Sequence, residues 1–195
     1  MTELKEIVKM ELNKINIIAL CGQAGSGKDT VLKALKEKYP GLHEIVSCTT
    51  RPPREGEVDG INYHFLTNEE FAEKVLNNDM LEATVFNDWC YGTALSDLDK
   101  KAVNIGVFNP EGIAIIKEDP RLSVDTYLIY TSDKERLLRQ LNRETNPNVN
   151  EIIRRFYTDN ADFQNLEEKI GDFVALQNTN KQDIQDIVNF IGHFY

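Results

Sequence analysis

A glycine-rich stretch that ends in a lysine, residues 22–30, carries the clearest chemistry in the chain. It reads Gly-Gln-Ala-Gly-Ser-Gly-Lys-Asp-Thr, and this spacing of glycines and lysine is typical of a phosphate-binding loop. Glycines let successive backbone N–H groups turn inward around an anion, and the positive end of a following helix adds attraction. A turn that only joins a strand to a helix is the alternative. We expect triphosphate binding by Gly22, Gly25, Ser26, Gly27 and Lys28, with Lys28 reaching the β and γ oxygens.

The two residues after Lys28 depart from the simple pattern. Asp29 stands where a serine or threonine usually follows the lysine, and the hydroxyl comes one place later, at Thr30. A carboxylate in the first helical turn suits the helix dipole, so we interpret Asp29 as a capping residue in preference to a metal ligand. Both residues are expected at the triphosphate site, with Thr30 as the contact to its Mg²⁺.

A second candidate anion site follows at residues 51–54, where two arginines flank a Pro-Pro pair. Prolines fix the backbone, so Arg51 and Arg54 are held in a defined relative position that suits bidentate recognition of another phosphate. Tyr63 offers a hydroxyl nearby in sequence. The alternative is a pair of arginines on a solvated face.

The stretch 49–65 resembles the signature of the guanylate kinase family, and it follows the phosphate loop at the expected distance. The matching positions are Thr49, Thr50, Arg51, Arg54, Glu57, Gly60, Tyr63, His64 and Phe65. The resemblance implies reversible transfer of the γ-phosphoryl group of ATP, with Mg²⁺, to GMP or dGMP in purine nucleotide metabolism. It also implies that Arg51, Arg54 and Tyr63 grip the GMP phosphate and that Lys28 and Arg51 take part in catalysis.

The same resemblance assigns residues that read the base. Glu82 aligns with the glutamate that recognises guanine, Ser47 and Thr93 with hydroxyls near O6, and Tyr91 with a second phosphate-binding tyrosine. The assignment of Glu82 makes chemical sense, because a carboxylate offers two acceptors to the N1–H and N2–H₂ donors of guanine.

The resemblance also implies a lid whose arginines neutralise charge in the transition state. Arg139, Arg143 and Arg155 align with these catalytic positions, whereas Arg136 and Arg154 are interpreted as solvated neighbours. In the family an asparagine after the last strand lies beside the adenine of ATP. Asn178 is assigned here, and Gln177, one place earlier, is the alternative.

The chain departs from the family at Val107 and Asn109, where acidic residues are usual. Mg²⁺ is therefore expected to be held mainly by ATP oxygens and water, with Thr30 and Asn109 as outer contacts. Two other functions stay open: a kinase for another nucleoside monophosphate, and a non-catalytic guanylate-kinase-like module that binds peptides.

The alternation of strand and helix patterns predicts an α/β fold: a three-layer P-loop nucleotide kinase fold with a mostly parallel sheet. Strands are expected at 15–21, 43–47, 126–130 and 173–178, and a closing helix at 181–194. One domain over residues 1–195 would contain a core (about 15–46, 98–133 and 159–195), a GMP-binding region (about 47–97) and a helical lid (about 134–158). Residues 2–14 show helical spacing, which indicates an accessory helix.

Composition limits the partners and the compartment. With 195 residues, 41% of them hydrophobic, the chain can form one compact domain. A net charge of −10 argues against binding to nucleic acid or to an anionic membrane surface. Three cysteines without metal-ligand spacing indicate reduced thiols, and no segment has the roughly 18 apolar residues of a membrane span. We expect a cytoplasmic monomer or homodimer that acts on small molecules.

Overall fold

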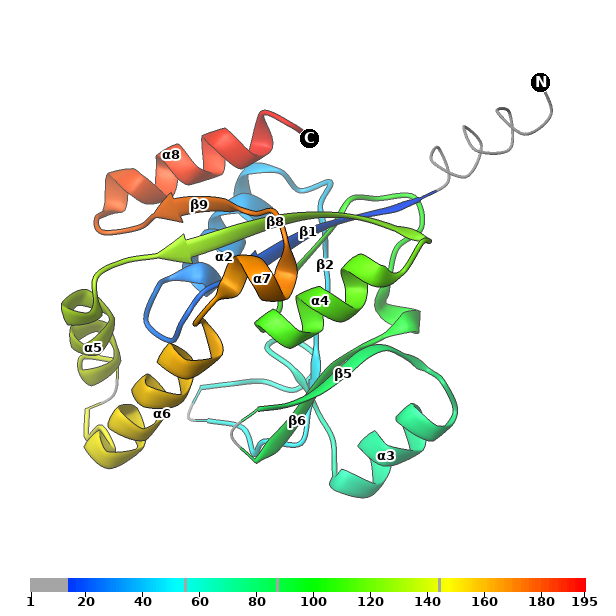
Figure 1. The fold of residues 1–195 in the computed structure, drawn as a ribbon, viewed down its shortest axis with the longest axis horizontal. Helices are drawn as coiled ribbons and strands as arrows, with labels where there is room; N and C mark the ends of the chain where they lie inside the picture. The colour runs from blue at the N-terminus through cyan, green and yellow to red at the C-terminus, as the bar shows by residue number, and fades with distance from the viewer. Residues whose placement is uncertain (1–13, 55, 87, 144) are drawn as a thin grey trace.

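The computed structural model describes residues 14–195 except 55, 87 and 144, so the accessory helix expected at 2–14 falls almost wholly outside the described residues. The main sheet has the strand order β2-β7-β1-β8-β9, and every neighbouring pair in it is parallel (Figure 1). The strands are β1 (Ile15–Cys21), β2 (His43–Glu44), β7 (Asn104–Val107), β8 (Leu122–Tyr130) and β9 (Val174–Gln177).

Helices cover both faces of this sheet because β1 presents apolar side chains alternately to each side. Ile18 and Leu20 pack against α2 (Lys28–Lys38) and α8 (Lys181–Gly192) in one buried cluster. Ile17 and Ala19 belong to a second cluster, with α4 (Pro110–Glu118) and α7 (Leu166–Ile170). The predicted three-layer α/β fold with a mostly parallel sheet is confirmed.

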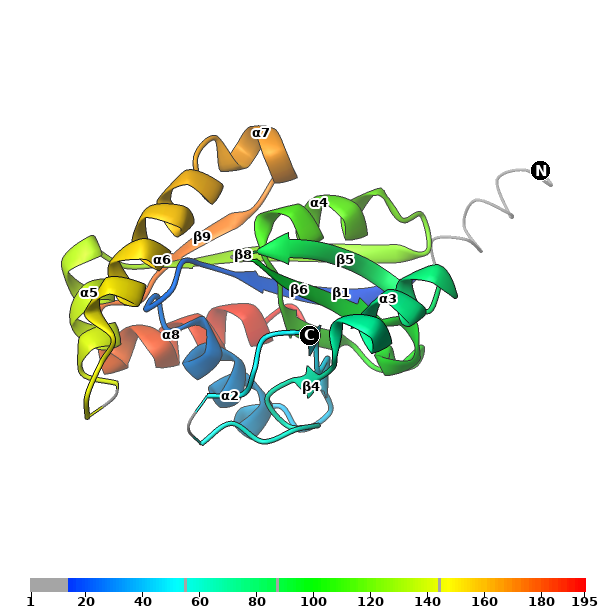
Figure 2. The same cartoon turned by 90° about the horizontal axis from the view of Figure 1, so that it is seen from below.

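A second, four-stranded sheet is built from residues 48–94 and has the order β4-β3-β6-β5 (Figure 2). Its strands are β3 (Cys48–Thr49), β4 (His64–Phe65), β5 (Met80–Phe86) and β6 (Trp89–Ala94), followed by the short 3₁₀ helix η1 (Leu95–Asp97). Strand β3 pairs in parallel with β4 and antiparallel with β6, which also pairs antiparallel with β5.

Helix α3 (Asn68–Leu76) packs beside this sheet and begins at a capping box formed by Thr67 and Glu70. The Thr67 hydroxyl accepts from the backbone of Glu70, whose carboxylate accepts from the backbone of Thr67. Phe71 is buried, whereas Val75 and Leu76 are 43% and 81% exposed. The sheet gives α3 room to bury one large side chain near its start and leaves its last turn in solvent.

Two helices, α5 (Asp133–Leu141) and α6 (Val149–Asp162), form the helical pair predicted as a lid. Ser132 and Asn148 cap them through side-chain oxygens. Strand β8 begins at Leu122, four residues before the predicted start at 126, because Leu122 already pairs with Ile15 in the parallel ladder.

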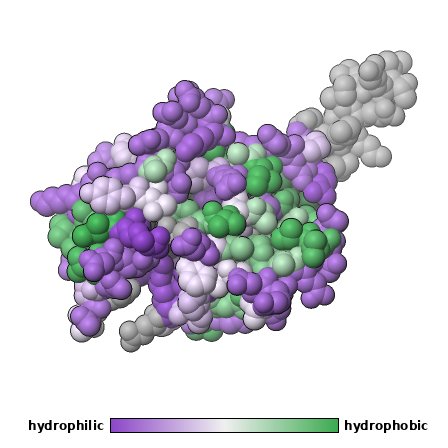
Figure 3. Space-filling view, turned by 60° about the horizontal axis from the view of Figure 1, so that its bottom comes forward, coloured by the Kyte–Doolittle hydropathy of each residue, from purple (hydrophilic) through white to green (hydrophobic). Residues whose placement is uncertain are grey.

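The surface of the described part mixes polar and apolar residues. Figure 3 shows hydrophilic residues over much of one face, with apolar residues gathered in separate patches between them. None of the helices in the described residues is both long and apolar enough to cross a bilayer.

Candidate active site

The phosphate loop joins β1 to α2, and its glycines allow close packing on its outer side. Gly25 and Gly27 have φ angles of 81° and 90°, which favour glycine. A Cβ on Gly27 would lie 2.3 Å from Nδ2 of Asn178, which donates to the carbonyl oxygen of Ser26 at 2.8 Å. Asn178 is buried whereas Gln177 is exposed, so Asn178 is the residue of the two that packs against the loop.

Arg139 also lies on this outer side of the loop. Its guanidinium donates to the Ser26 carbonyl oxygen at 3.1 Å and to the Asn178 carbonyl oxygen at 2.9 Å. The structure therefore places Arg139 between α5, the loop and the end of β9, and it does not bring this arginine into the pocket described below.

The first turn of α2 corrects one expectation. The residue that caps the helix is Gly27, without a side-chain hydrogen bond, so the interpretation of Asp29 as the cap is wrong. The Asp29 side chain is 74% exposed, with one oxygen 3.9 Å from Nζ of Lys28, and Thr30 is exposed as well. Both lie in the first turn, where the helix dipole favours an anion.

One pocket gathers half of the predicted site residues, from the loop, α6 and the region of the second sheet. Lys28 and Arg155 line it from different helices, and Glu82 lies in its wall. The predicted residues that line it are Gly22, Lys28, Ser47, Arg51, Arg54, Tyr63, Glu82, Tyr91 and Arg155. Sequence reasoning had given no role there to Ala24, Thr84, Phe86, Gly92, Phe108, Pro110, Asp159 and Phe163.

Arg51 is held in place by Glu57, a position that belongs to the signature but had no assigned role. One guanidinium nitrogen of Arg51 donates to both carboxylate oxygens of Glu57, at 3.0 and 2.9 Å. The same carboxylate accepts from the backbone N–H of Arg54 at 2.7 Å. Burial alone would raise the pKa of Glu57, but the Arg54 amide and the Arg51 guanidinium lower it below its ordinary value.

Positive charge concentrates around Arg54. Burial, and next the neighbouring charges of Arg155 and Arg51, lower the pKa of Arg54, and Arg143 adds to the effect. Arginines that repel one another across a pocket are stabilised when an anion binds between them. Burial likewise raises the pKa of Tyr63 to about 12, so its hydroxyl keeps its proton and can donate to such an anion.

Glu82 also lines the pocket and is 7% exposed. The hydroxyl of Thr93 donates to Oε1 of Glu82 at 2.9 Å. Burial raises the pKa of Glu82 to about 7, and the charge of Glu111 contributes in the same direction. Thr93 is fully buried behind Glu82, so it orients the carboxylate, whereas Ser47 lines the pocket itself.

Val107 and Asn109, the two departures from the family pattern, also line the pocket. Asn109 caps α4 by accepting from the N–H of Gly112 at 2.7 Å, and its amide nitrogen donates to the Thr84 hydroxyl at 2.7 Å. Its polar groups are therefore engaged in joining α4 to β5. Within the described residues, no group of three or more His, Cys, Asp or Glu side chains could hold a metal ion.

Arg136 is the clearest failure of sequence reasoning in this region. Predicted to be solvated, it is 1% exposed and ion-paired with Asp133 and Asp159. Asp133, three residues before it on the same helix, is the one local signal that could have indicated a pair. Arg154 is confirmed as an exposed neighbour, with a 45% exposed side chain paired with Glu151.

A parallel sheet with a glycine-rich phosphate loop between its central strand and a helix defines the P-loop kinase fold, and the arginine-lined pocket beside the loop fits a phosphorylated second ligand. The sequence model of one family, described as guanylate kinase, matches residues 14–193. The chain therefore belongs to the guanylate kinase family.

Individual relatives match over shorter stretches. A guanylate kinase of Clostridium perfringens (strain SM101 / Type A) is 47% identical over 96 residues, which cover 46% of this chain and 44% of the relative. One of Helicobacter pylori (strain ATCC 700392 / 26695) is 42% identical over 88 residues, 45% of this chain and 43% of the relative. The matched stretches thus span less than half the length of these curated relatives.

A solved structure shows the fold over a greater length. The crystal structure of guanylate kinase from Anaplasma phagocytophilum superimposes with a TM-score of 0.69 over 93% of this chain and 85% of that chain. The sequence identity is 22%, so this likeness concerns the fold alone.

Proposed function

We propose that this protein is a guanylate kinase, which transfers the γ-phosphoryl group of ATP reversibly to GMP or dGMP and forms ADP and GDP or dGDP. The observation that carries this proposal is the composition of the single pocket described above. There Lys28 of the phosphate loop, the arginines Arg51 and Arg54, and the buried carboxylate of Glu82 line one space. These groups fit a triphosphate, a monophosphate and a guanine base, respectively.

The reaction in this pocket rests on alignment and charge neutralisation. An oxygen of the GMP phosphate attacks the γ-phosphorus, and the bond from that phosphorus to the bridging β–γ oxygen breaks with its electron pair retained by ADP. The attacking oxygen is already ionised at neutral pH, so no strong base is required. Lys28 neutralises the donor, Arg51, Arg54 and Tyr63 hold the acceptor, and Arg143 and Arg155 of the lid region neutralise charge between them.

Base recognition rests on Glu82, to which Ser47 adds a hydroxyl in the same pocket, while Tyr91 binds the acceptor phosphate. An ionised carboxylate accepts from N1–H and N2–H₂ of guanine at once, whereas AMP has an acceptor at N1 and no 2-amino group. The hydroxyl of Thr93 fixes the orientation of the carboxylate.

Mg²⁺ fits this site as an ion that arrives with the nucleotide. The described residues offer no cluster of three acidic, His or Cys ligands, and Asn109 is engaged as a helix cap. Mg²⁺ retains several waters and needs few protein ligands, so the exposed Thr30 in the first turn of α2 would suffice as its protein contact. When bound, the ion neutralises charge between the β and γ phosphates.

We also propose a division of the chain into a core (about 15–46, 98–133 and 159–195), a GMP-binding region (about 47–97) and a lid (about 134–158). In this arrangement the ATP-binding residues of the core include Gly22, Gly25, Ser26, Gly27 and Asn178. Arg139 joins the lid to this part of the core. The net charge of −10 supports small-molecule partners over nucleic acid or membranes, in a cytoplasmic monomer or homodimer.

The test is release of ADP from ATP and Mg²⁺ with GMP, dGMP, AMP, CMP and UMP in turn. GMP or dGMP should be phosphorylated well above the others, and Lys28→Ala should lower turnover by about 10² or more through lost transition-state stabilisation. Preference for a different monophosphate would identify another nucleotide kinase. ATP binding without ADP release from any monophosphate would favour a non-catalytic binding module.

A further inference from the structure

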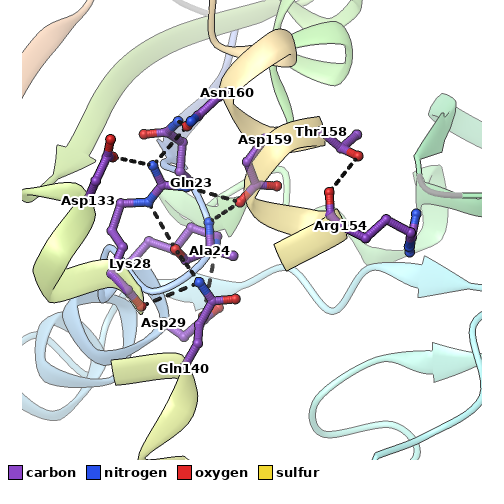
Figure 4. A network of polar contacts seen from close by, with 11 residues as sticks. Gln23, Ala24, Lys28, Asp29, Asp133, Gln140, Arg154, Thr158, Asp159 and Asn160 are labelled. Atoms are coloured by element: carbon purple, nitrogen blue, oxygen red, sulfur yellow. Dashed lines mark hydrogen bonds and ion pairs between the residues drawn. The ribbon is translucent and has the colours of Figure 1, made fainter. Parts of the chain in front are cut away.

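A buried ion pair links the two helices of the lid region to the phosphate loop. Arg136 of α5 and Asp159 of α6 approach within 3.6 Å, nitrogen to oxygen, and their side chains are 1% and 5% exposed. The Asp159 carboxylate accepts from the N–H of Ala24 at 2.6 Å (Figure 4). Nε of Arg136 donates to the carbonyl oxygen of the same loop residue at 3.1 Å. Each helix therefore holds one of the two peptide groups that flank Ala24.

Neighbouring contacts strengthen this link. The side-chain oxygen of Asn160 accepts from the side-chain amide nitrogen of Gln23 at 2.7 Å and from the guanidinium of Arg136 at 3.1 Å. The guanidinium carbon of Arg136 lies 4.8 Å from the centre of the Phe156 ring. Two adjacent residues of α6 thus bind two adjacent residues of the loop, and Arg136 contacts both of these α6 residues.

The link also lies next to the proposed chemistry. Asp159 stands four residues after Arg155, so the two share one face of α6, and both line the pocket. A buried ion pair generally adds little net stability compared with apolar residues of similar size. A charged pair that grips the phosphate loop one helical turn from a pocket arginine is therefore better explained by precise placement of that arginine.

We propose that Asp159 is a positioning residue for phosphoryl transfer. By binding the Ala24 amide and Arg136, it fixes α6 against the phosphate loop and sets the distance between Arg155 and the transferred group. This inference rests on the proposed function, because the placement of Arg155 affects a rate only if a phosphoryl group is transferred in this pocket.

The test compares Asp159→Asn and Asp159→Ala with a matched control on the same helix. Asparagine keeps the shape and one acceptor oxygen but loses the charge that pairs with Arg136, and alanine loses both. Thr158→Ala is the control, because Thr158 points toward Arg154 and donates to its carbonyl oxygen at 3.1 Å (Figure 4). Each folded protein, checked by its unfolding transition, is assayed for kcat and for both KM values. Hydrogen exchange of the Ala24 amide is measured without nucleotide.

We expect Asp159→Asn to lower kcat by about tenfold and Asp159→Ala by about 10², as for misplaced catalytic groups. The KM for GMP should stay within about twofold, since Arg51, Arg54 and Glu82 are untouched. Exchange at Ala24 should accelerate in the same order, and Thr158→Ala should match the wild type in each measurement. If the alanine variant does not fold, the asparagine variant decides.

Wild-type kcat in a folded Asp159→Asn protein, or unchanged exchange at Ala24, overturns the positioning role alone. A loss of GMP affinity at constant kcat also overturns it, because that result places Asp159 in ground-state binding. Wild-type protein that releases no ADP with any monophosphate overturns the proposed function and, with it, a role in transfer. The two failures are therefore distinguishable.

Discussion

Glu82 shows how one buried side chain can set both base selectivity and pH dependence. Its carboxylate is 7% exposed, receives a hydrogen bond from Thr93, and has a pKa raised to about 7 by burial. Only the ionised form presents two acceptors to guanine. Guanine binding should therefore favour loss of the proton and strengthen as the pH rises through 7.

For Glu82, we predict that the KM for GMP falls by about tenfold between pH 6 and pH 8, as a single group with a pKa near 7 requires. Glu82→Gln should remove this contribution and reduce the preference for GMP over IMP, which lacks the 2-amino group. The measurement is steady-state kinetics with both nucleotides across this range. An unchanged GMP to IMP preference in the variant would remove Glu82 from base recognition.

For Arg51, we predict that alanine substitution raises the KM for GMP far more than the KM for ATP. The loss of binding free energy for GMP should be about 2–5 kcal/mol if the phosphate contact is buried. Arg51 is 7% exposed and oriented by Glu57, so Glu57→Gln should produce a smaller change in the same direction. Arg121→Ala, at a 65% exposed side chain, is the control and should alter neither constant. Equal weakening of both substrates would show that Arg51 is structural.

For Asp29, we predict that Asp29→Ser leaves Mg²⁺-dependent turnover intact or raises it. The carboxylate is 74% exposed, and serine would supply the hydroxyl that usually follows the loop lysine. Turnover should still disappear when Mg²⁺ is removed. If Asp29→Ala abolishes turnover while ATP binding and the fold persist, Asp29 is a direct metal ligand. That result would contradict the hypothesis that Mg²⁺ is held mainly by ATP oxygens and water.

At the scale of elements, helix α5 carries two arginines that both donate to carbonyl oxygens of the phosphate loop but differ in their other partners. Arg136 is buried and also pairs with Asp159 of α6, whereas Arg139 also donates to the carbonyl oxygen of Asn178, directly after β9. The helix falls within the predicted lid, and the Ser132 cap at its start is a local feature of the sequence. The burial of Arg136 could not be predicted in the same way, since Asp159 comes from another helix.

For the buried pair, we predict that Arg136→Leu lowers the free energy of unfolding by about 3–5 kcal/mol, because Asp159 loses its buried partner. Arg154→Leu, which breaks an exposed pair with Glu151, should cost no more than about 0.5 kcal/mol. Urea denaturation of both variants gives the comparison. Replacing Asp159 as well should recover part of the Arg136→Leu loss, and equal costs for the two single variants would contradict a buried pair.

For the whole molecule, the main sheet could be predicted from the sequence more fully than the pocket could. Strand β1 and the loop were predicted because an apolar run followed by glycines and lysine is local, and β1 has the predicted bounds. The second sheet joins β3 to β6, segments some forty residues apart, and its pairing depends on tertiary packing. Glu57 lies within the recognised signature, but its contact with Arg51, in which one guanidinium nitrogen donates to both carboxylate oxygens, depends on how the loop folds.

The charge of the whole chain and the charge around the pocket have opposite signs. The chain carries a net charge of −10, yet the charges of Arg155, Arg51 and Arg143 all lower the pKa of Arg54 in the pocket. A globally acidic molecule repels polyanions, while a local group of arginines still attracts a nucleotide. The whole-chain charge therefore supports the proposed choice of small partners, and the local charge supports the proposed site.

The raised pKa of Glu82 also predicts how the stability of the whole molecule responds to pH without nucleotide. Because the folded-state pKa of about 7 exceeds the ordinary value of 4.5, the native state binds more protons than the unfolded chain between these values. The contribution of Glu82 to the free energy of unfolding therefore falls as the pH rises from 4.5 to 7, by up to about 3 kcal/mol, and is constant above.

Other carboxylates, such as Glu57 with its lowered pKa, contribute with the opposite sign at lower pH, so the wild-type curve alone does not isolate Glu82. The measurement is the free energy of unfolding of the wild type minus that of Glu82→Gln, by urea denaturation at intervals from pH 5 to pH 8. This difference should decline up to about pH 7 and then level off. A difference that rises with pH would mean that Glu82 is stabilised as a carboxylate in the free protein, contrary to the effect of its burial.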